Sequence, residues 1–168
     1  KVTVPRTSNG IEVYYIDVNY SDEENSTEFI KTFEQILNLD QAPNIVELRL
    51  NNNILDNSSI QSIGNLKKLD YLSLSGNNVV DLDFLQELVS LTHLELARCN
   101  IEQSKEIQLK DSSTGETVTK QIDNMSYLSN MKELIILDLS DNSEIKDISE
   151  LSTLTKLGVF YINNVELE

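Results

Sequence analysis

The residues of this chain best suited to acid–base chemistry are His93, its single histidine, and Glu95 two positions later. Alternate residues of a β-strand share a face, so a strand here would place the imidazole beside the carboxylate. A hydrolytic site also needs a nucleophile, and the candidates Ser73 and Ser75 belong to a chain in which serine is common. We therefore interpret His93 as a surface residue and expect no catalytic residues and no enzymatic activity.

Metal and cofactor chemistry find little support in the residue types. Cys99 is the single cysteine, and one cysteine with one histidine cannot complete a zinc site without several carboxylates. Asp17, Glu95 and Asp138 are too widely spaced for an obvious calcium site, and no Asp-x-Asp-x-Asp-Gly loop occurs. The five glycines form no phosphate-binding motif. We expect no metal and no cofactor.

The charge of the chain narrows the classes of partner. Its 168 residues include 13 basic and 28 acidic side chains, a net charge of −15. Such a chain is repelled by nucleic acid and by anionic membrane surfaces. No run of about 18 apolar residues predicts membrane insertion. The chain begins at Lys1 without an apolar leader, so we expect a processed or truncated form. A protein partner and a monomeric state are favoured.

The elements that position these residues are repeats of one pattern. Leu-x-x-Leu-x-Leu, or a close variant, begins at residues 45, 69, 91, 134 and 157, at intervals of 24, 22, 43 and 23 residues. This is the signature of leucine-rich repeats, whose period is about 20–29 residues. Each unit predicts a short strand whose leucines face the interior. Apolar residues three positions apart then predict 3₁₀ turns or short helices at Leu82/Leu85/Leu88, Met125/Leu128/Met131 and Ile148/Leu151/Leu154.

The position after each strand predicts a ladder of buried amides. An asparagine side chain there can satisfy backbone groups of neighbouring repeats that are hidden from water. The predicted ladder residues are Asn53, Asn77, Cys99 and Asn142. Cys99 is interpreted as a small buried residue in the series, not as a reactive thiol.

The ends and one insertion depart from the repeat. Residues 1–44 are predicted to be an N-terminal cap, a strand that includes Val13 and Ile16 followed by a helix through about residue 38. Residues 45–168 are predicted to be the repeats. The long interval is read as one repeat with a hairpin or loop inserted at about 103–121, around the turn-forming residues 111–115. Val165 replaces the last ladder asparagine.

The residues after the ladder position carry a family resemblance. Asn77-Asn-Val79-Val-Asp81-Leu82-Asp-Phe-Leu85 fits Asn-x-Ile/Val-x-Asp-Ile/Leu-x-x-Leu, and residues 142–151 fit it with one added residue. The pattern resembles the 22-residue repeat of bacterial internalin-like and SDS22-like proteins. The resemblance implies an α/β fold, a right-handed leucine-rich-repeat solenoid with a parallel β-sheet on its concave side.

The same resemblance implies a function. It indicates a protein-recognition module of a secreted or surface-exposed bacterial protein that binds through the concave face. Two alternatives stay open: an intracellular, cytoplasmic SDS22-like scaffold or regulatory subunit, and a repeat module of a larger enzyme.

Strand alternation predicts which side chains reach the concave face. Three positions in each repeat qualify, and they align into three stripes across the sheet. We expect partner binding from the first two stripes at Tyr15, Asp17, Glu47, Arg49, Tyr71, His93, Glu95, Ile136, Asp138, Val159 and Tyr161. Ser73 lies in the second stripe, and the third contains Asn19, Asn51, Ser75, Ala97, Ser140 and Asn163. The alternative is that exposed apolar residues such as Val159 are ordinary surface residues.

Overall fold

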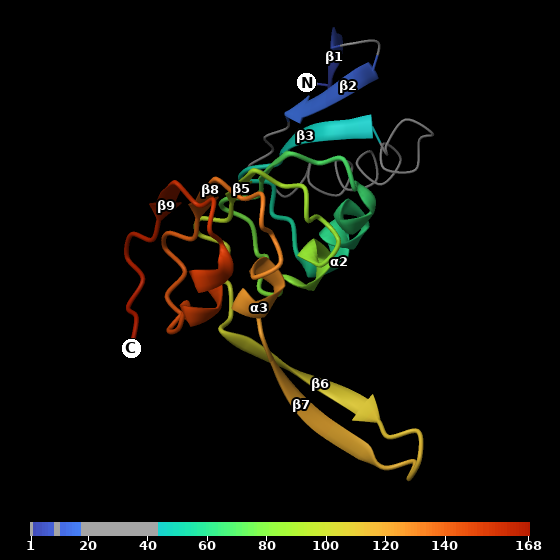
Figure 1. Cartoon of the computed structure of the whole chain (residues 1–168), viewed down its shortest axis with the longest axis vertical. Helices are drawn as coiled ribbons and strands as arrows, with labels where there is room; N and C mark the ends of the chain where they lie inside the picture. Colours follow the sequence, from blue (N-terminus) through green and yellow to red (C-terminus); the bar gives the residue numbers. More distant parts are fainter. Residues whose placement is uncertain (1, 9–10, 18–43) are drawn as a thin grey trace.

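The computed structural model describes residues 2–8, 11–17 and 44–168, and its main feature is a seven-stranded sheet (Figure 1). The predicted helix before residue 38 and position Asn19 lie outside the described residues. The first two strands pair antiparallel and every later neighbour is parallel. In spatial order the strands are β1 (Val2–Ser8), β2 (Ile11–Asp17), β3 (Ile45–Arg49), β4 (Tyr71–Ser73), β5 (His93–Glu95), β8 (Ile136–Asp138) and β9 (Val159–Tyr161).

The five repeat strands align in the register that the leucine pattern predicts. Leu48 pairs with Leu72, Leu72 with Leu94, and Leu94 with Leu137. All four side chains are fully buried. Strand β5 neighbours β8 directly, so the interval of 43 residues contains one repeat and an insertion. A parallel stack of this kind buries a core that no single repeat could bury alone.

The return segments are the short helices predicted from the period of three. The 3₁₀ helix η3 (Asp83–Leu85), α3 (Met125–Leu128) and η4 (Ser149–Thr153) coincide with the three predicted segments. The first repeat uses α2 (Asn57–Ile60) and η2 (Gln61–Asn65). Asp56 caps α2, because its carboxylate accepts a hydrogen bond from the Ser59 amide at 3.0 Å.

Each repeat strand leaves the sheet through the same left-handed turn. The residue just before the ladder position has a positive φ in all five repeats: Asn52, Gly76, Arg98, Asp141 and Asn164. Asparagine, aspartate and glycine tolerate this conformation best, and Arg98 adopts it despite its longer side chain. The turn recurs even before Val165, where the ladder asparagine is lost.

Asn77 ties two repeats together through buried hydrogen bonds. Its Oδ1 accepts hydrogen bonds from the backbone amides of Asn53 and Leu55, each at 3.0 Å. Its Nδ2 donates to the carbonyls of Leu50 at 2.8 Å and Leu74 at 2.6 Å. These are the contacts expected of a ladder amide, and they satisfy backbone groups that lie away from water.

Asn142 makes the equivalent contacts in the last ladder step. Its Oδ1 accepts from the amides of Cys99 at 3.0 Å and Ile101 at 3.1 Å. Its Nδ2 donates to the carbonyls of Leu96 and Leu139, both at 2.9 Å. Cys99 is itself fully buried and its thiol donates to the Leu74 carbonyl at 3.3 Å. Burial raises the pKa of the Cys99 thiol to about 12, which keeps it protonated and unreactive.

A further buried asparagine, Asn124, fastens the insertion to the repeats. Its Oδ1 accepts from the Leu82 amide at 3.0 Å, and its Nδ2 donates to the carbonyls of Val80 and Glu102 at 3.0 and 2.8 Å. The residue is fully buried although it begins an Asn-x-Ser triplet. Its amide is fully used in the fold, so it cannot carry a glycan without unfolding this region.

The insertion is a two-stranded antiparallel hairpin that projects from the repeats (Figure 1). Strand β6 (Ser104–Lys110) pairs with β7 (Thr117–Asp123), so the hairpin ends two residues later than the predicted limit at 121. The turn follows from Asp111, whose carboxylate accepts from the amides of Ser113 and Thr114 at 2.7 and 3.0 Å. Gly115 completes it with a φ of 74°.

Candidate partner-binding face

The predicted binding residues pair across the strands in the order of the stripes, and from Glu47 onward they lie on one side of the sheet. Tyr15 pairs with Glu47, and the series continues through Tyr71, His93, Ile136 and Val159. The second series aligns equally: Asp17, Arg49, Ser73, Glu95, Asp138 and Tyr161. We call this side the sheet face and define it by the members of these two series on β3, β4, β5, β8 and β9. The leucines between them point to the other side and are buried.

Arg49, Tyr71 and Glu95 form a connected cluster on three neighbouring strands of the sheet face. The Arg49 guanidinium donates to the Tyr71 hydroxyl at 3.0 Å, and this hydroxyl donates to Glu95 Oε1 at 2.7 Å. Arg49 also lies 4.0 Å from the centre of the Tyr71 ring and 2.6 Å from the Glu47 carboxylate. The contacts hold four large side chains in fixed orientations at a partly exposed surface, which lowers the entropy that binding would cost.

Ser73 has the register predicted for the second stripe, but its larger neighbours cover it. Ser73 is fully buried, because its hydroxyl lies 2.6 Å from Glu95 Oε2 and 2.5 Å from Asn51 Oδ1. Ala97 and Ser140 in the third stripe are also buried. Small residues on this side are therefore covered by larger neighbours, and the accessible surface belongs mainly to the first two stripes.

The histidine has different partners from those the acid–base hypothesis required. The His93 ring stacks on Tyr71 with centroids 5.6 Å apart, and its Nδ1 lies 2.7 Å from the Thr92 hydroxyl. Glu95 instead binds Tyr71 and Ser73. His93 therefore extends the aromatic cluster, in agreement with its interpretation as a surface residue.

A more apolar patch lies at the other end of the sheet face. Val159 and Tyr161 on β9 are 37% and 50% exposed, and Ile136 pairs with Val159 from β8. Asp138 pairs with Tyr161, two positions after the Ile136–Val159 pair, and its carboxylate accepts a hydrogen bond from the Ser140 amide. We name Ile136, Val159 and Tyr161 the C-terminal patch. Exposed aromatic and aliphatic side chains beside a carboxylate suit a protein surface better than a small polar ligand.

The environment of Tyr71 yields a prediction for its ionisation. Burial, together with the hydrogen bond to Glu95, raises the pKa of Tyr71 from its usual 10 to about 12. The folded protein thus holds this proton more tightly than the unfolded chain. The stabilisation is complete below about pH 10 and is lost as the pH rises through 12.

An absorbance titration of wild type minus Tyr71→Phe isolates this tyrosine. The absorbance change that wild type shows and Tyr71→Phe lacks is the ionisation of Tyr71, and its midpoint should lie near pH 12. Glu95→Gln should lower that midpoint, because it removes the carboxylate that accepts the tyrosine hydrogen bond. A midpoint near pH 10 in wild type would contradict the hydrogen-bonded cluster.

Other kinds of site are not found in the described residues. Within residues 2–8, 11–17 and 44–168, no group of three or more metal-ligating side chains is close enough to hold a metal ion. In the same part of the chain, no helix combines the length and apolar character needed to cross a membrane.

Comparison with solved structures returns bacterial repeat proteins. The internalin InlF of Listeria monocytogenes matches with a TM-score of 0.59 and 27% identity over 76% of this chain and 31% of its own. Internalin C2 of the same organism matches with a TM-score of 0.59 and 19% identity over 95% and 74%. The functional domain of InlJ, which includes a cysteine ladder, gives 0.53 and 16% over 94% and 27%. This chain thus spans less than a third of the InlF and InlJ structures. No protein-family model and no curated protein matches the chain.

Proposed function

We propose that this leucine-rich-repeat, internalin-like protein binds a protein partner through its sheet face, the side predicted to be concave. The similarity to internalin structures supports the class of protein, a protein-interaction module. The observation that carries the proposal is the cluster of Arg49, Tyr71 and Glu95, whose orientations are fixed before any partner arrives. Tyrosine and arginine are the residue types that most often dominate binding energy at protein interfaces.

The chemistry of the face indicates the kind of partner. Glu95 and Asp138 lie in one stripe with Tyr161, beside the aliphatic residues Ile136 and Val159. A partner surface that offers aliphatic side chains and a lysine or arginine would match this combination. The net charge of −15 favours such a partner during its approach as well.

We further propose that the protein acts as a monomer outside the cell or at the bacterial surface, without catalysis. This setting rests on the internalin resemblance, and a cytoplasmic scaffold or an enzyme-linked module is the alternative. The division into a cap at 1–44 and repeats at 45–168 belongs to the same proposal. The cytoplasmic alternative predicts a partner among the proteins of the source cell.

The proposal is tested by using the protein as bait against two pools of potential partners. One pool contains extracellular and surface proteins of cells that a bacterium meets, and the other contains cytosolic proteins of the source cell. We expect a specific partner in the first pool. Its binding should protect the Tyr161 side chain from chemical labelling. A specific partner in the cytosolic pool alone would overturn the proposed setting, and unaffected labelling would overturn the proposed face.

A further inference from the structure

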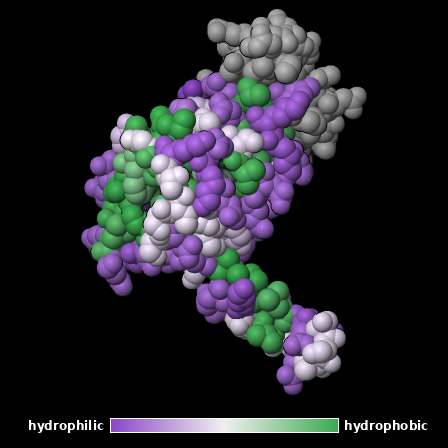
Figure 2. Space-filling model, viewed as in Figure 1, coloured by the Kyte–Doolittle hydropathy of each residue, from purple (hydrophilic) through white to green (hydrophobic). Residues whose placement is uncertain are grey.

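The projecting hairpin has one aliphatic side that the repeat fold does not use. Paired residues of an antiparallel hairpin share a face, and the pairs alternate between its two faces. On one face stand the pairs Leu109–Val118, Ile107–Lys120 and Lys105–Ile122. The opposite face holds Lys110–Thr117, Gln108–Thr119 and Glu106–Gln121. The hairpin is therefore amphipathic, and hydrophobic residues (green) are seen along its length in Figure 2.

Within the described part of the molecule, the outer part of the aliphatic face is uncovered, whereas Lys105 at its base packs against the repeats. Leu109 is 47% exposed and Val118 is 51% exposed, and neither belongs to the repeat core. The hairpin sheet has two strands, so each strand also has one edge with unpaired backbone groups. A two-stranded hairpin with a bare aliphatic face is marginally stable in water, and a partner that covers this face would stabilise it.

The base of the hairpin is fixed firmly to the repeats. Lys105 forms ion pairs with Asp81 and with Asp83, the latter at 2.9 Å, and lies 5.5 Å from the Tyr127 ring. Burial opposes the charge of Lys105, but its hydrogen bonds to the two carboxylates outweigh this and raise its pKa. Gln103 adds hydrogen bonds from the amides of residues 146 and 147 to its side-chain oxygen. The hairpin is thus presented in a defined direction.

The charge on the aliphatic face has one sign. Its charged residues are Lys105, which is already paired, and Lys120, which forms no ion pair with any residue that the structure describes. Residues 104–123 contain three lysines and four carboxylates, whereas the whole chain carries −15. Lys120 lies three residues before Asp123, where β7 joins the repeats, so it is about 10 Å along the strand from them. This is little more than one Debye length of about 8 Å, so the charge of the acidic repeats is partly screened at Lys120.

We infer that the free edge of β7 docks an extended strand of a partner protein with the alternation aliphatic–polar–acidic–polar–aliphatic. A strand added to this edge would place alternate side chains next to Val118, Lys120 and Ile122. Its carboxylate meets Lys120 while its aliphatic residues cover the two neighbours. Two observations favour the edge of β7 over that of β6 as the docking site. Residues 117–121 of β7 are all exposed, and the charge of Lys105 on β6 is already neutralised by its ion pairs.

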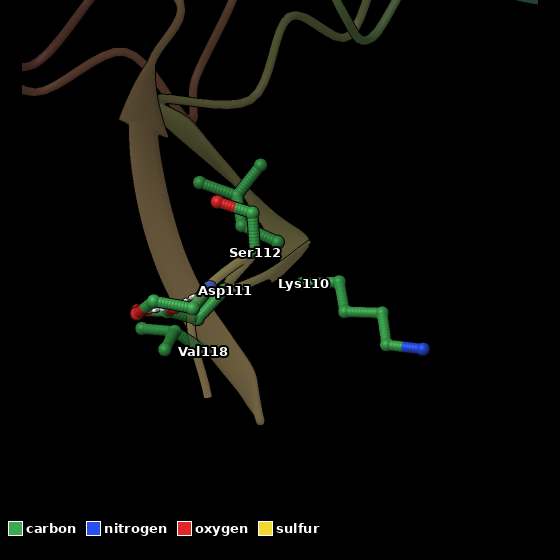
Figure 3. A pocket seen from close by; sticks show the side chains of 6 residues that line it. Lys110, Asp111, Ser112 and Val118 are labelled. Atoms are coloured by element: carbon green, nitrogen blue, oxygen red, sulfur yellow. Dashed lines mark hydrogen bonds between the residues drawn. The ribbon is translucent and has the colours of Figure 1, made fainter. Parts of the chain in front are cut away.

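The tip of the hairpin offers room for one end of such a strand. A depression of about 530 Å³ is lined by Leu109, Lys110, Asp111, Ser112, Ser113 and Val118. In Figure 3 the Lys110 side chain points away from Val118, so its charge does not occupy this space. The aliphatic residue of the added strand that lies beside Val118 would enter the depression.

Two other occupants fit the observations less well. A second copy of this chain would be repelled, because it carries the same charge of −15. The four aliphatic side chains would also bury far less than the roughly 1,200 Å² that a stable interface needs. An anionic membrane would be repelled by the acidic repeats. A protein strand gains backbone hydrogen bonds as well as aliphatic contacts and needs only one carboxylate.

The test is fluorescence anisotropy with two labelled peptides that contain Val-Thr-Glu-Thr-Val or Val-Thr-Lys-Thr-Val. We expect the wild-type protein to prefer the glutamate peptide, and Lys120→Glu to reverse this preference by about tenfold. Lys68→Glu changes the net charge equally but lies in the first repeat, outside the hairpin, so it should leave the preference unchanged. Val118→Ser should weaken both peptides by about fivefold.

Reversal by Lys120→Glu also shows that this variant remains folded, because it binds the lysine peptide. Four results would overturn the inference. The first two are no binding of the glutamate peptide and equal effects of Lys120→Glu and Lys68→Glu. The other two are a Val118-dependent dimer in sedimentation and Val118-dependent binding to phosphatidylserine vesicles. None of these results bears on the sheet face, which these variants leave intact.

Discussion

Replacing Asn77 by alanine is expected to lower the free energy of unfolding by about 3 kcal/mol. The side chain serves the backbone amides of Asn53 and Leu55 and the carbonyls of Leu50 and Leu74. Alanine leaves these groups without their partner, and Asn77 is only 4% exposed, so water cannot readily replace the amide. Urea denaturation followed by circular dichroism measures the change.

The neighbouring Asn78 provides the matched control. It is exposed, and its side chain accepts one exposed hydrogen bond from Asn100 at 3.0 Å. Asn78→Ala should therefore change the stability by less than about 0.5 kcal/mol. Equal losses in the two variants would show that the ladder contacts do not stabilise the repeats.

Much of the repeat fold could be predicted from the sequence because one local pattern determines it. The leucine spacing predicts the five repeat strands, which begin at residues 45, 71, 93, 136 and 159. Stacking of equivalent repeats then determines the register between these strands. Leu48, Leu72, Leu94 and Leu137 therefore align as expected. The ladder contacts of Asn77 and Asn142 follow from the same repetition. The cap helix and its residues lie outside the described part and stay a prediction.

Other structural residues could not be found by counting along the sequence. Asn124 and Gln103 act where the hairpin joins the repeats, and their partners lie 20 to 44 positions away. The ion pairs of Lys105 with Asp81 and Asp83 depend on the same junction. An insertion has no repeat to set its register, so its contacts depend on the folded geometry.

The register of the residues on the sheet face could be predicted from the sequence, but their side-chain contacts could not. Alternation placed Tyr71 beside Glu47 and His93, as the structure has it. It did not predict that Tyr71 would connect the two stripes by bonding to Arg49 and Glu95. Nor did it predict the burial of Ser73 beneath them, because that depends on side-chain length and orientation.

The second large effect is expected at Tyr71. If the sheet face binds the partner, Tyr71→Ala should weaken binding at least about thirtyfold, the loss typical of an interface hot spot. The variant removes the ring that stacks on His93 and the hydroxyl that orients Arg49 and Glu95. Tyr71→Phe retains the ring and should lose less. Because the side chain is half-buried on the surface of the sheet, both variants should remain folded.

Titration calorimetry of the captured partner against four proteins tests the central claim most directly. These are wild type, Tyr71→Ala, Tyr161→Ala and Gln86→Ala, the last an exposed residue of a return segment away from the sheet. Binding through the sheet face predicts strong loss in both tyrosine variants and wild-type affinity in Gln86→Ala. Undiminished affinity in folded Tyr71→Ala and Tyr161→Ala would contradict it and place recognition elsewhere on the molecule.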